Sequence, residues 1–247
     1  SATGDPHLTT FDGIAYDYQA AGEFVLARDT DGTPRVQARL EPVGGRDVSI
    51  VTAVATELNN TKITIDARDE QMLSIAGSPR PLPIGESVTV GDGELFRTSE
   101  KFVLVYPGAD GQVDDGDTRL EATVRGDRLD VIIKPNRSSV VSMSGLLGSP
   151  DGNVSNDLMR ADGSTLSPSP TFEELYGQYR EDYRVTADNS LFDYDGGESA
   201  AGFYNPDFPA TRVTIGDLPA DKRQAAINVA INAGLEPGTA AFHDAVL

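Results

Sequence analysis

The sequence predicts a mainly β protein, an antiparallel β-sandwich with a small α-helical C-terminal extension. Apolar and polar residues alternate in short runs over about residues 13–144, as expected for strands with one buried face. Pairs rich in Gly and Asp separate these runs and predict turns. After Met159 the alternation stops and helix-start signals appear. Some ten or more short strands of this kind form a sandwich or a barrel.

The strands are predicted from individual runs. Residues 62–66, 120–124 and 128–133 alternate cleanly, which predicts half-buried strands. Residues 102–106 are apolar on both faces and predict a central strand. The predicted turns lie at Asp31-Gly32, Gly44-Gly45, Gly91-Asp92-Gly93, Asp110-Gly111 and Gly126-Asp127.

The C-terminal third predicts helices joined by irregular chain. Thr171 and Glu174 form a capping box, which predicts a short helix to about Gln178. Residues 179–209 are expected to be irregular, with Phe192 and Tyr194 anchoring a packed peptide. A helix is expected over about residues 218–233, capped by Asp217 and ended by Gly234, and another from about Thr239. The predicted apolar stripe of the first of these is Ala226, Val229, Ala230 and Ala233.

Composition excludes several functional classes. The 247 residues include no cysteine, which excludes disulfides, thiolate metal sites and cysteine nucleophiles. The net charge of −19 disfavours nucleic acid and anionic membranes and attracts cations, although it also serves solubility. The sequence contains no run of about 18 apolar residues, so no membrane-spanning segment is predicted. The first residues carry no signal segment and the end is apolar and uncapped, so we expect a fragment of a longer protein.

One loop, residues 145–157, concentrates oxygen-bearing side chains. Alternating oxygen donors in a Gly-containing loop suit a hard cation such as Ca²⁺. The spacing from Asp151 to Asp162 resembles an EF-hand loop, but the Gly at the sixth position, the final Glu and the flanking helices are missing. The alternative is an Asx-rich turn that binds nothing. A second acidic stretch, residues 110–117, is expected to be a solvated hairpin loop rather than a second calcium site.

Two stretches together resemble a known family. "GDPHLTTFDGIAYDYQAAGEFVL" near the start and "GLLGSPDGNVSND" from Gly145 resemble the two signature segments of the von Willebrand factor type D domain. The resemblance covers about residues 1–165. The later part is similar to the segments C-terminal to such domains, and its helical end resembles the eight-cysteine module of that family without its cysteines. We therefore expect a β-sandwich at 1–165, a connection with one short helix at 166–209, and a truncated helical subdomain at 210–247.

The resemblance implies a calcium ion held between the Phe-Asp-Gly turn and the later loop. Asp12, Asp151 and Asp157 would supply charge, and neutral oxygens would complete the shell. Ser149 departs from the usual Asn. Gly22 and Leu147 stand where the family usually carries cysteines, which excludes disulfide-linked oligomers of this fragment. The implied metal ligands are Asp12, Ser149, Asp151, Asn153 (through its carbonyl), Asn156 and Asp157.

The motif Gly-Asp-Pro-His carries a second implication, since some relatives cleave themselves between Asp and Pro. The Asp5 carboxylate would attack its own carbonyl to form a cyclic anhydride, and His7 would protonate the departing Pro6 nitrogen. The alternative is structural: Asp5 caps a turn, Pro6 starts it and His7 packs or hydrogen-bonds.

The sequence thus predicts a calcium-binding, extracellular, structural or adhesive module of a larger secreted or surface protein, of prokaryotic type. Its expected partners are other extracellular proteins or neighbouring domains of the same chain. The alternative is a self-processing module that cleaves the Asp5–Pro6 bond. No residue constellation predicts an enzyme that acts on a separate substrate.

Overall fold

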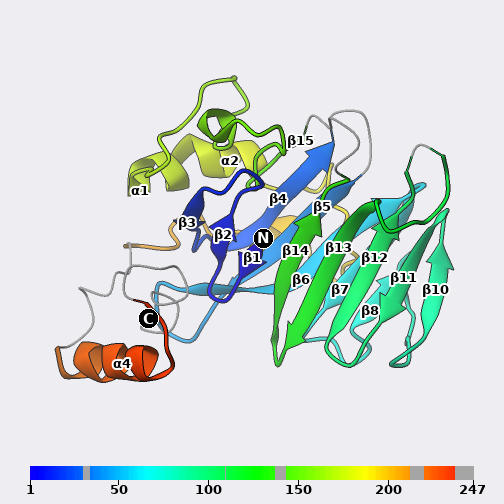
Figure 1. Cartoon of the computed structure of the whole chain (residues 1–247), viewed down its shortest axis with the longest axis horizontal. Helices are drawn as coiled ribbons and strands as arrows, with labels where there is room; N and C mark the ends of the chain where they lie inside the picture. The colour runs from blue at the N-terminus through cyan, green and yellow to red at the C-terminus, as the bar shows by residue number, and fades with distance from the viewer. Residues whose placement is uncertain (30–33, 109, 137–142, 212–219, 237–247) are drawn as a thin grey trace.

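The computed structural model describes residues 1–29, 34–108, 110–136, 143–211 and 220–236. The described strands form two antiparallel sheets that face each other, as predicted (Figure 1). The larger sheet has the order β10-β11-β12-β13-β14-β1-β2-β3, and the smaller has the order β15-β4-β5-β6-β7-β8-β9. None of the described helices has the length and hydrophobicity of a membrane-spanning segment.

The strands of the larger sheet come from two separate parts of the chain. A central block is built by consecutive hairpins, and the first strands of the chain add to it by pairing of β1 with β14. The strands of the larger sheet are β1 (Ala2–Thr3), β2 (His7–Thr9), β3 (Ala15–Asp17), β10 (Ser87–Val90), β11 (Gly93–Arg97), β12 (Lys101–Tyr106), β13 (Thr118–Arg125) and β14 (Arg128–Lys134).

The smaller sheet is a meander with one added edge strand. Its members are β4 (Gly22–Asp29), β5 (Arg35–Pro42), β6 (Ser49–Leu58), β7 (Thr61–Asp66), β8 (Leu73–Ile75), β9 (Ser78–Pro79) and β15 (Met143–Ser144). The turn from β6 to β7 uses Asn59 and Asn60, both with positive φ. Asn tolerates this conformation better than most residues, so the turn sets the register of the longest hairpin.

The core lies between the sheets and draws on both of them. Phe24 and Leu40 of the smaller sheet and Phe102, Leu104 and Leu120 of the larger sheet are at most 1% exposed. The alternation seen in the sequence places these side chains inward, and their burial supplies the main stabilising free energy of a chain without disulfides.

The outer face of the larger sheet carries a charge ladder across three strands. Glu121 on β13 accepts from Lys101 Nζ on β12 and from Lys134 Nζ on β14, each at 2.5 Å. Burial by itself raises the pKa of Glu121, but the two ammonium groups outweigh it and the net shift is downward. The ladder therefore stabilises the pairing of β12, β13 and β14 while the carboxylate is ionised.

The helices follow the sandwich in sequence. The predicted capping box is present, because Thr171 N donates to Glu174 Oε2 and Glu174 N donates to Thr171 Oγ1. The helical stretch continues to Tyr183, five residues beyond the expected end, with one wider turn in its middle. The helical elements are η1 (Val154–Asn156), α1 (Phe172–Glu174), η2 (Leu175–Tyr179), α2 (Arg180–Tyr183), α3 (Ala200–Phe203) and α4 (Ala220–Asn232).

Helix α4 confirms the expected helix but not its whole apolar stripe. Ala230 is buried, with Ala226 packed against it, whereas Val229 is 65% exposed. The stripe prediction was therefore wrong at Val229 and at Ala233, which is also exposed, because helical spacing defines candidate faces but not which face meets a neighbour. The predicted turn at Asp31-Gly32, the cap Asp217 and the helix expected from Thr239 lie outside the described residues.

Residues 185–205, here called the strap, cover the outer face of the smaller sheet. Val185 N donates to Glu23 O, and Asn205 N donates to Ala21 O. Between these ends, the Gln37 side chain bonds the backbone of Asn189 and Leu191. Strands β4, β5 and β6 are consequently buried on both faces, and the sandwich and the chain beyond residue 165 pack together.

Candidate functional site

The Phe-Asp-Gly turn (residues 10–14) joins β2 to β3 and carries Asp12. Thr10 N donates to Ile14 O, and Gly13 takes a φ of +104°, which favours glycine. Thr10 Oγ1 donates to Asp157 Oδ2 at 2.6 Å, and Phe11 N donates to Leu147 O at 2.9 Å. Two direct hydrogen bonds therefore hold this turn against the later loop.

The later loop, residues 145–157, is fixed by its apolar residues and by glycine. Leu146 and Leu147 are fully buried, so Leu147 fills with hydrophobic volume the position where the family resemblance implied a cysteine. Gly148 has a φ of +71°, and a Cβ at this position would lie 2.3 Å from Asp157 Oδ1. Only glycine permits this close approach of the loop backbone to the Asp157 carboxylate.

Three side-chain oxygens at this junction are buried and accept no hydrogen bond within the described structure: Asp12 Oδ2, Asn156 Oδ1 and Asp157 Oδ1. A buried acceptor without a donor costs about 1–3 kcal/mol. Burial also raises the pKa of Asp157, and the neighbouring Asp12 charge adds to the rise, partly offset by Thr10. Both effects are those that a bound cation would relieve, so this oxygen set fits Ca²⁺.

The remaining predicted ligands lie on the exposed side of the same loop. Asp151 accepts from Asn156 Nδ2 and from Asn153 N, and these hydrogen bonds lower its pKa. The carbonyl of Asn153 accepts from Asn156 N, and its side chain caps Ser155. The backbone N–H of Ser149 offsets a small part of the rise in the pKa of Asp157. Five of the six predicted residues therefore lie on this loop and Asp12 lies on the turn that contacts it, while Asp151, Asn153 and Asn156 are engaged in the loop's own turns.

The carboxylates at this junction would not be sufficient by themselves to bind a metal ion. Among the described residues, no group of three or more His, Cys, Asp or Glu side chains is arranged to hold a metal ion. A cation here would need neutral oxygens from Asn156, Ser149 or the backbone. Asp162 caps Ser164 in an exposed turn, and η1 is not flanked by two helices, so the loop is not an EF-hand.

The acidic stretch at residues 110–117 uses its carboxylates to stabilise turns. Asp114 N donates to Asp117 Oδ2, and Gly116 N donates to Asp114 Oδ1. Gln112 N donates to Asp110 Oδ1 in the same way. This agrees with the interpretation of the stretch as an acidic hairpin loop.

The Asp5–Pro6 bond lies at the tip of the β1–β2 hairpin. Gly4, with a φ of +71°, donates its N–H to Asp130 Oδ1, and Tyr18 N donates to Pro6 O. The His7 ring is buried and lies between two carboxylates. Its Nε2 is 3.0 Å from Asp5 Oδ1, and its Nδ1 is 2.6 Å from Asp17 Oδ1.

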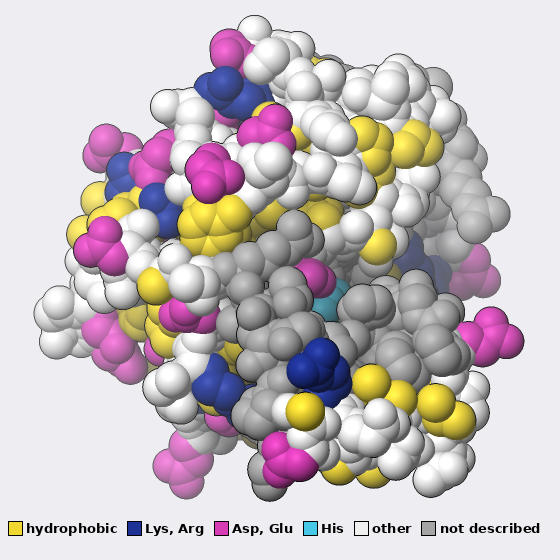
Figure 2. All heavy atoms as spheres, turned by 90° about the vertical axis from the view of Figure 1, so that its left-hand side faces the viewer, with side chains coloured by type: hydrophobic (Ala, Val, Ile, Leu, Met, Phe, Trp, Pro, Cys, Tyr) yellow, Lys and Arg dark blue, Asp and Glu magenta, His cyan; other side chains and the backbone are white. Residues whose placement is uncertain are grey.

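The sequence interpretation included Asp5 and His7 but missed Asp17. Asp17 lies directly opposite His7 in the β2–β3 ladder. The available signal was the Tyr-Asp-Tyr alternation at residues 16–18, which predicts a strand whose Asp points away from the flanking tyrosines. Figure 2 shows the described histidine in cyan, with an acidic side chain beside it.

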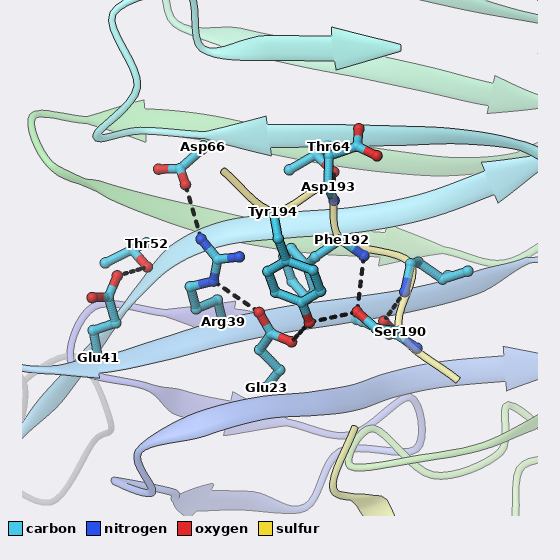
Figure 3. Close-up of polar contacts among 12 residues, drawn as sticks. Glu23, Arg39, Glu41, Thr52, Thr64, Asp66, Ser190, Phe192, Asp193 and Tyr194 are labelled. Carbon is cyan, nitrogen blue, oxygen red and sulfur yellow. Dashed lines mark hydrogen bonds and ion pairs between the residues drawn. The ribbon is translucent and has the colours of Figure 1, made fainter. Parts of the chain in front are cut away.

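A third polar cluster fastens the strap to the smaller sheet (Figure 3). The Arg39 guanidinium contacts Glu23 at 2.9 Å and Asp66 at 3.2 Å, and its centre lies 3.8 Å from the centroid of the Phe203 ring. Tyr194 OH donates to the other oxygen of Glu23. Burial raises the pKa of Glu23 more than Tyr194 and Arg39 lower it.

The strap peptide around this cluster is packed as predicted. Phe192 is 2% exposed and packs in a small cluster with Ala53, Ala55 and Leu191, against which Tyr194 also packs. The Arg39 ring contacts and ion pairs are internal, and Arg39 itself is 5% exposed. We therefore assign this cluster to the attachment of the strap.

The chain belongs to the von Willebrand factor type D domain family, whose profile matches residues 1–164. It is similar to SCO-spondin of Gallus gallus, with 29% identity over 71% of this chain and 3% of that protein. It is also similar to human zonadhesin, with 30% identity over 72% of this chain and 6% of that protein. Human sushi domain-containing protein 2 shows 27% identity over 79% of this chain and 24% of its own length. The chain thus spans less than a quarter of each of these relatives.

Proposed function

We propose that this chain is a calcium-stabilised interaction module of a larger extracellular or surface protein. The observation that carries the proposal is the set of three buried, donor-free oxygens where the Phe-Asp-Gly turn meets the loop at residues 145–157. Asp12, Asn156 and Asp157 would hold the ion, with Asp151, Ser149 and the Asn153 carbonyl completing the shell. The bound ion would supply the missing partner for each oxygen and neutralise the carboxylates.

The interaction role rests on family membership and on the relatives. Zonadhesin bears adhesion in its name, and the relatives are far longer than this chain. The expected partners are other extracellular proteins or neighbouring domains of the same chain. Catalysis on a separate substrate is not part of this proposal.

Melting with and without calcium tests the proposed site. Calcium at 100 times its Kd adds about 2.7 kcal/mol to the free energy of unfolding, which raises Tm by roughly 5–11 °C for a chain of this size. Chelation should lower Tm, and calcium should restore it. Asp157→Asn should abolish the calcium dependence, whereas Asp162→Asn, the same charge change in an exposed neighbouring turn, should preserve it. If the Tm of the wild-type protein is the same with and without chelator at neutral pH, the proposal is contradicted.

We further propose self-cleavage between Asp5 and Pro6 as a second function of the same domain. The supporting observation is the 3.0 Å separation of His7 Nε2 and Asp5 Oδ1 at a hairpin tip. The Asp5 carboxylate would add to the Asp5 carbonyl carbon, the bond to the Pro6 nitrogen would break, and His7 would protonate that nitrogen. Water would then open the five-membered anhydride, leaving a C-terminal Asp5 with two carboxyl groups.

Intact mass and N-terminal analysis test this second function. Incubation at pH 4–8 should give two products, residues 1–5 and a chain that begins at Pro6, faster at mildly acidic pH. Asp5→Ala should prevent both. Intact wild-type protein without a new Pro6 N-terminus at any of these pH values would dispose of the cleavage proposal.

A further inference from the structure

We propose that Asp17 is a positioning residue for cleavage of the Asp5–Pro6 bond. It holds the proton on His7 Nδ1, so that the opposite ring nitrogen, Nε2, faces the scissile turn. This inference rests on the self-cleavage proposed above, and no sequence motif in that proposal includes Asp17.

The pairing of β2 with β3 sets the Asp17–His7 contact. His7 and Asp17 are direct partners in the ladder, and their side chains therefore lie on the same side of the hairpin. The Nδ1–Oδ1 distance of 2.6 Å is shorter than the 3.0 Å distance from Nε2 to Asp5. It lies at the short end for a charge-assisted hydrogen bond, in which Nδ1–H donates to the carboxylate.

The residues on either side hold Asp17 rigidly. Tyr16 OH donates to Leu146 O at 2.6 Å, which ties β3 to the loop at residues 145–157. Tyr18 is fully buried and stacks on Tyr176, and its N–H donates to the carbonyl of Pro6. A carboxylate between two anchored neighbours keeps its partner ring in one orientation without an ordering cost at the moment of reaction.

This arrangement gives each ring nitrogen of His7 a separate task. With both nitrogens protonated, Nε2–H passes its proton to the Pro6 nitrogen as the C–N bond breaks. The ring is then neutral, with its remaining hydrogen on Nδ1 because Asp17 accepts it. Nε2 then accepts a proton from the water that opens the anhydride, which restores the starting ring. Asp17 changes neither charge nor protonation.

Asp17 also remains partly open to solvent, with its side chain 38% exposed, whereas the His7 side chain is 9% exposed. If Asp17 served only to pack against His7, its side chain would be expected to be as buried as the His7 side chain. The exposed carboxylate can be exchanged for an amide of nearly the same shape without leaving a cavity, so the role of its charge can be separated from its role in folding.

The test measures the rate of appearance of the Pro6 N-terminus in four proteins. Asp17→Asn should slow cleavage by about tenfold or more, because the amide can donate to Nδ1 and impose the other tautomer. Asp17→Glu, which keeps the carboxylate, should recover part of the rate. Asp127→Asn removes the same charge from a hairpin turn where the side chain is 71% exposed, and it should cleave like wild type. All variants should retain the wild-type Tm within a few degrees.

A spectroscopic readout separates positioning from a loss of structure. The chain has two histidines, so His243→Ala leaves His7 as its single imidazole. The ring ¹⁵N spectrum of this protein should show hydrogen retained on Nδ1 in the neutral ring, and the Asp17→Asn version should shift toward the Nε2–H tautomer.

The outcomes distinguish the two proposals. Wild-type cleavage with an equal rate in Asp17→Asn overturns the role of Asp17 and leaves self-cleavage standing. The role of Asp17 is also overturned if Asp17→Asn cleaves slowly, Asp17→Glu recovers none of the rate, and the loss of rate accompanies a lowered Tm. A wild-type chain that never cleaves removes the self-cleavage proposal itself, and the role of Asp17 with it.

Discussion

Replacing Gly148 by alanine tests the close contact at the centre of the candidate metal site. An alanine Cβ at this position would lie 2.3 Å from Asp157 Oδ1 and 2.9 Å from Asp157 Cα, and the backbone φ is +71°. The left-handed conformation costs a non-glycine residue roughly 1–2 kcal/mol, and overpacking of this kind adds roughly 1–3 kcal/mol. Gly148→Ala should therefore lower the free energy of unfolding by about 2–5 kcal/mol, measured by urea denaturation.

Gly152→Ala is the matched control on the same loop. Gly152 has a φ of +80°, but a Cβ there would meet no atom within 4 Å. It should incur only the conformational cost of roughly 1–2 kcal/mol. The difference between the two variants isolates the contact with Asp157, and equal destabilisation by both would refute the reasoning.

Further tests address the charge ladder and the buried tyrosines. Glu121→Gln should cost roughly 1–3 kcal/mol at pH 7. Because the folded-state pKa of Glu121 is lowered, this loss should disappear as the pH falls below the ordinary value of 4.5 and through the folded-state pKa, which Tm measured against pH will show. Tyr16→Phe should cost about 1 kcal/mol, since its hydroxyl donates to a backbone carbonyl. Tyr18→Phe should be neutral or stabilising, since its buried hydroxyl has no hydrogen-bond partner in the described structure, and urea denaturation compares the two.

Local patterns predicted much of the fold because they depend on neighbouring residues. The alternation at residues 62–66 and 128–133 became β7 and β14, and the capping box at Thr171 formed as written in the sequence. The proximity of Asp12 to Asp157 did not follow from any local pattern. It came from the family resemblance, because residues so far apart in the sequence meet only through the packing of the whole sandwich.

The features that escaped prediction depend on distant partners. Arg39 lies in a strand where alternation would let it face solvent, yet the strap, far later in the sequence, buries it. Asp17 acquires its meaning from the ladder partner across a hairpin. Val229 was wrongly predicted to be buried, because the sequence of α4 does not show which of its faces packs against a neighbouring element.

The position of the two-residue strand β1 determines how cleavage of the Asp5–Pro6 bond would change the resistance of the domain to a pulling force. Strand β1 lies between β14 and β2, so the chain on the N-terminal side of that bond is held in the sheet by Ala2, which pairs with both strands, and by Thr3, which pairs with His7. The Thr9–Ser1 backbone hydrogen bond and the Gly4–Asp130 hydrogen bond add to this attachment. In the intact chain, tension applied before β1 is carried by covalent bonds. After cleavage the same tension would be borne by a few hydrogen bonds, with no disulfide in parallel. The domain would then change from a permanent link into one that parts under load.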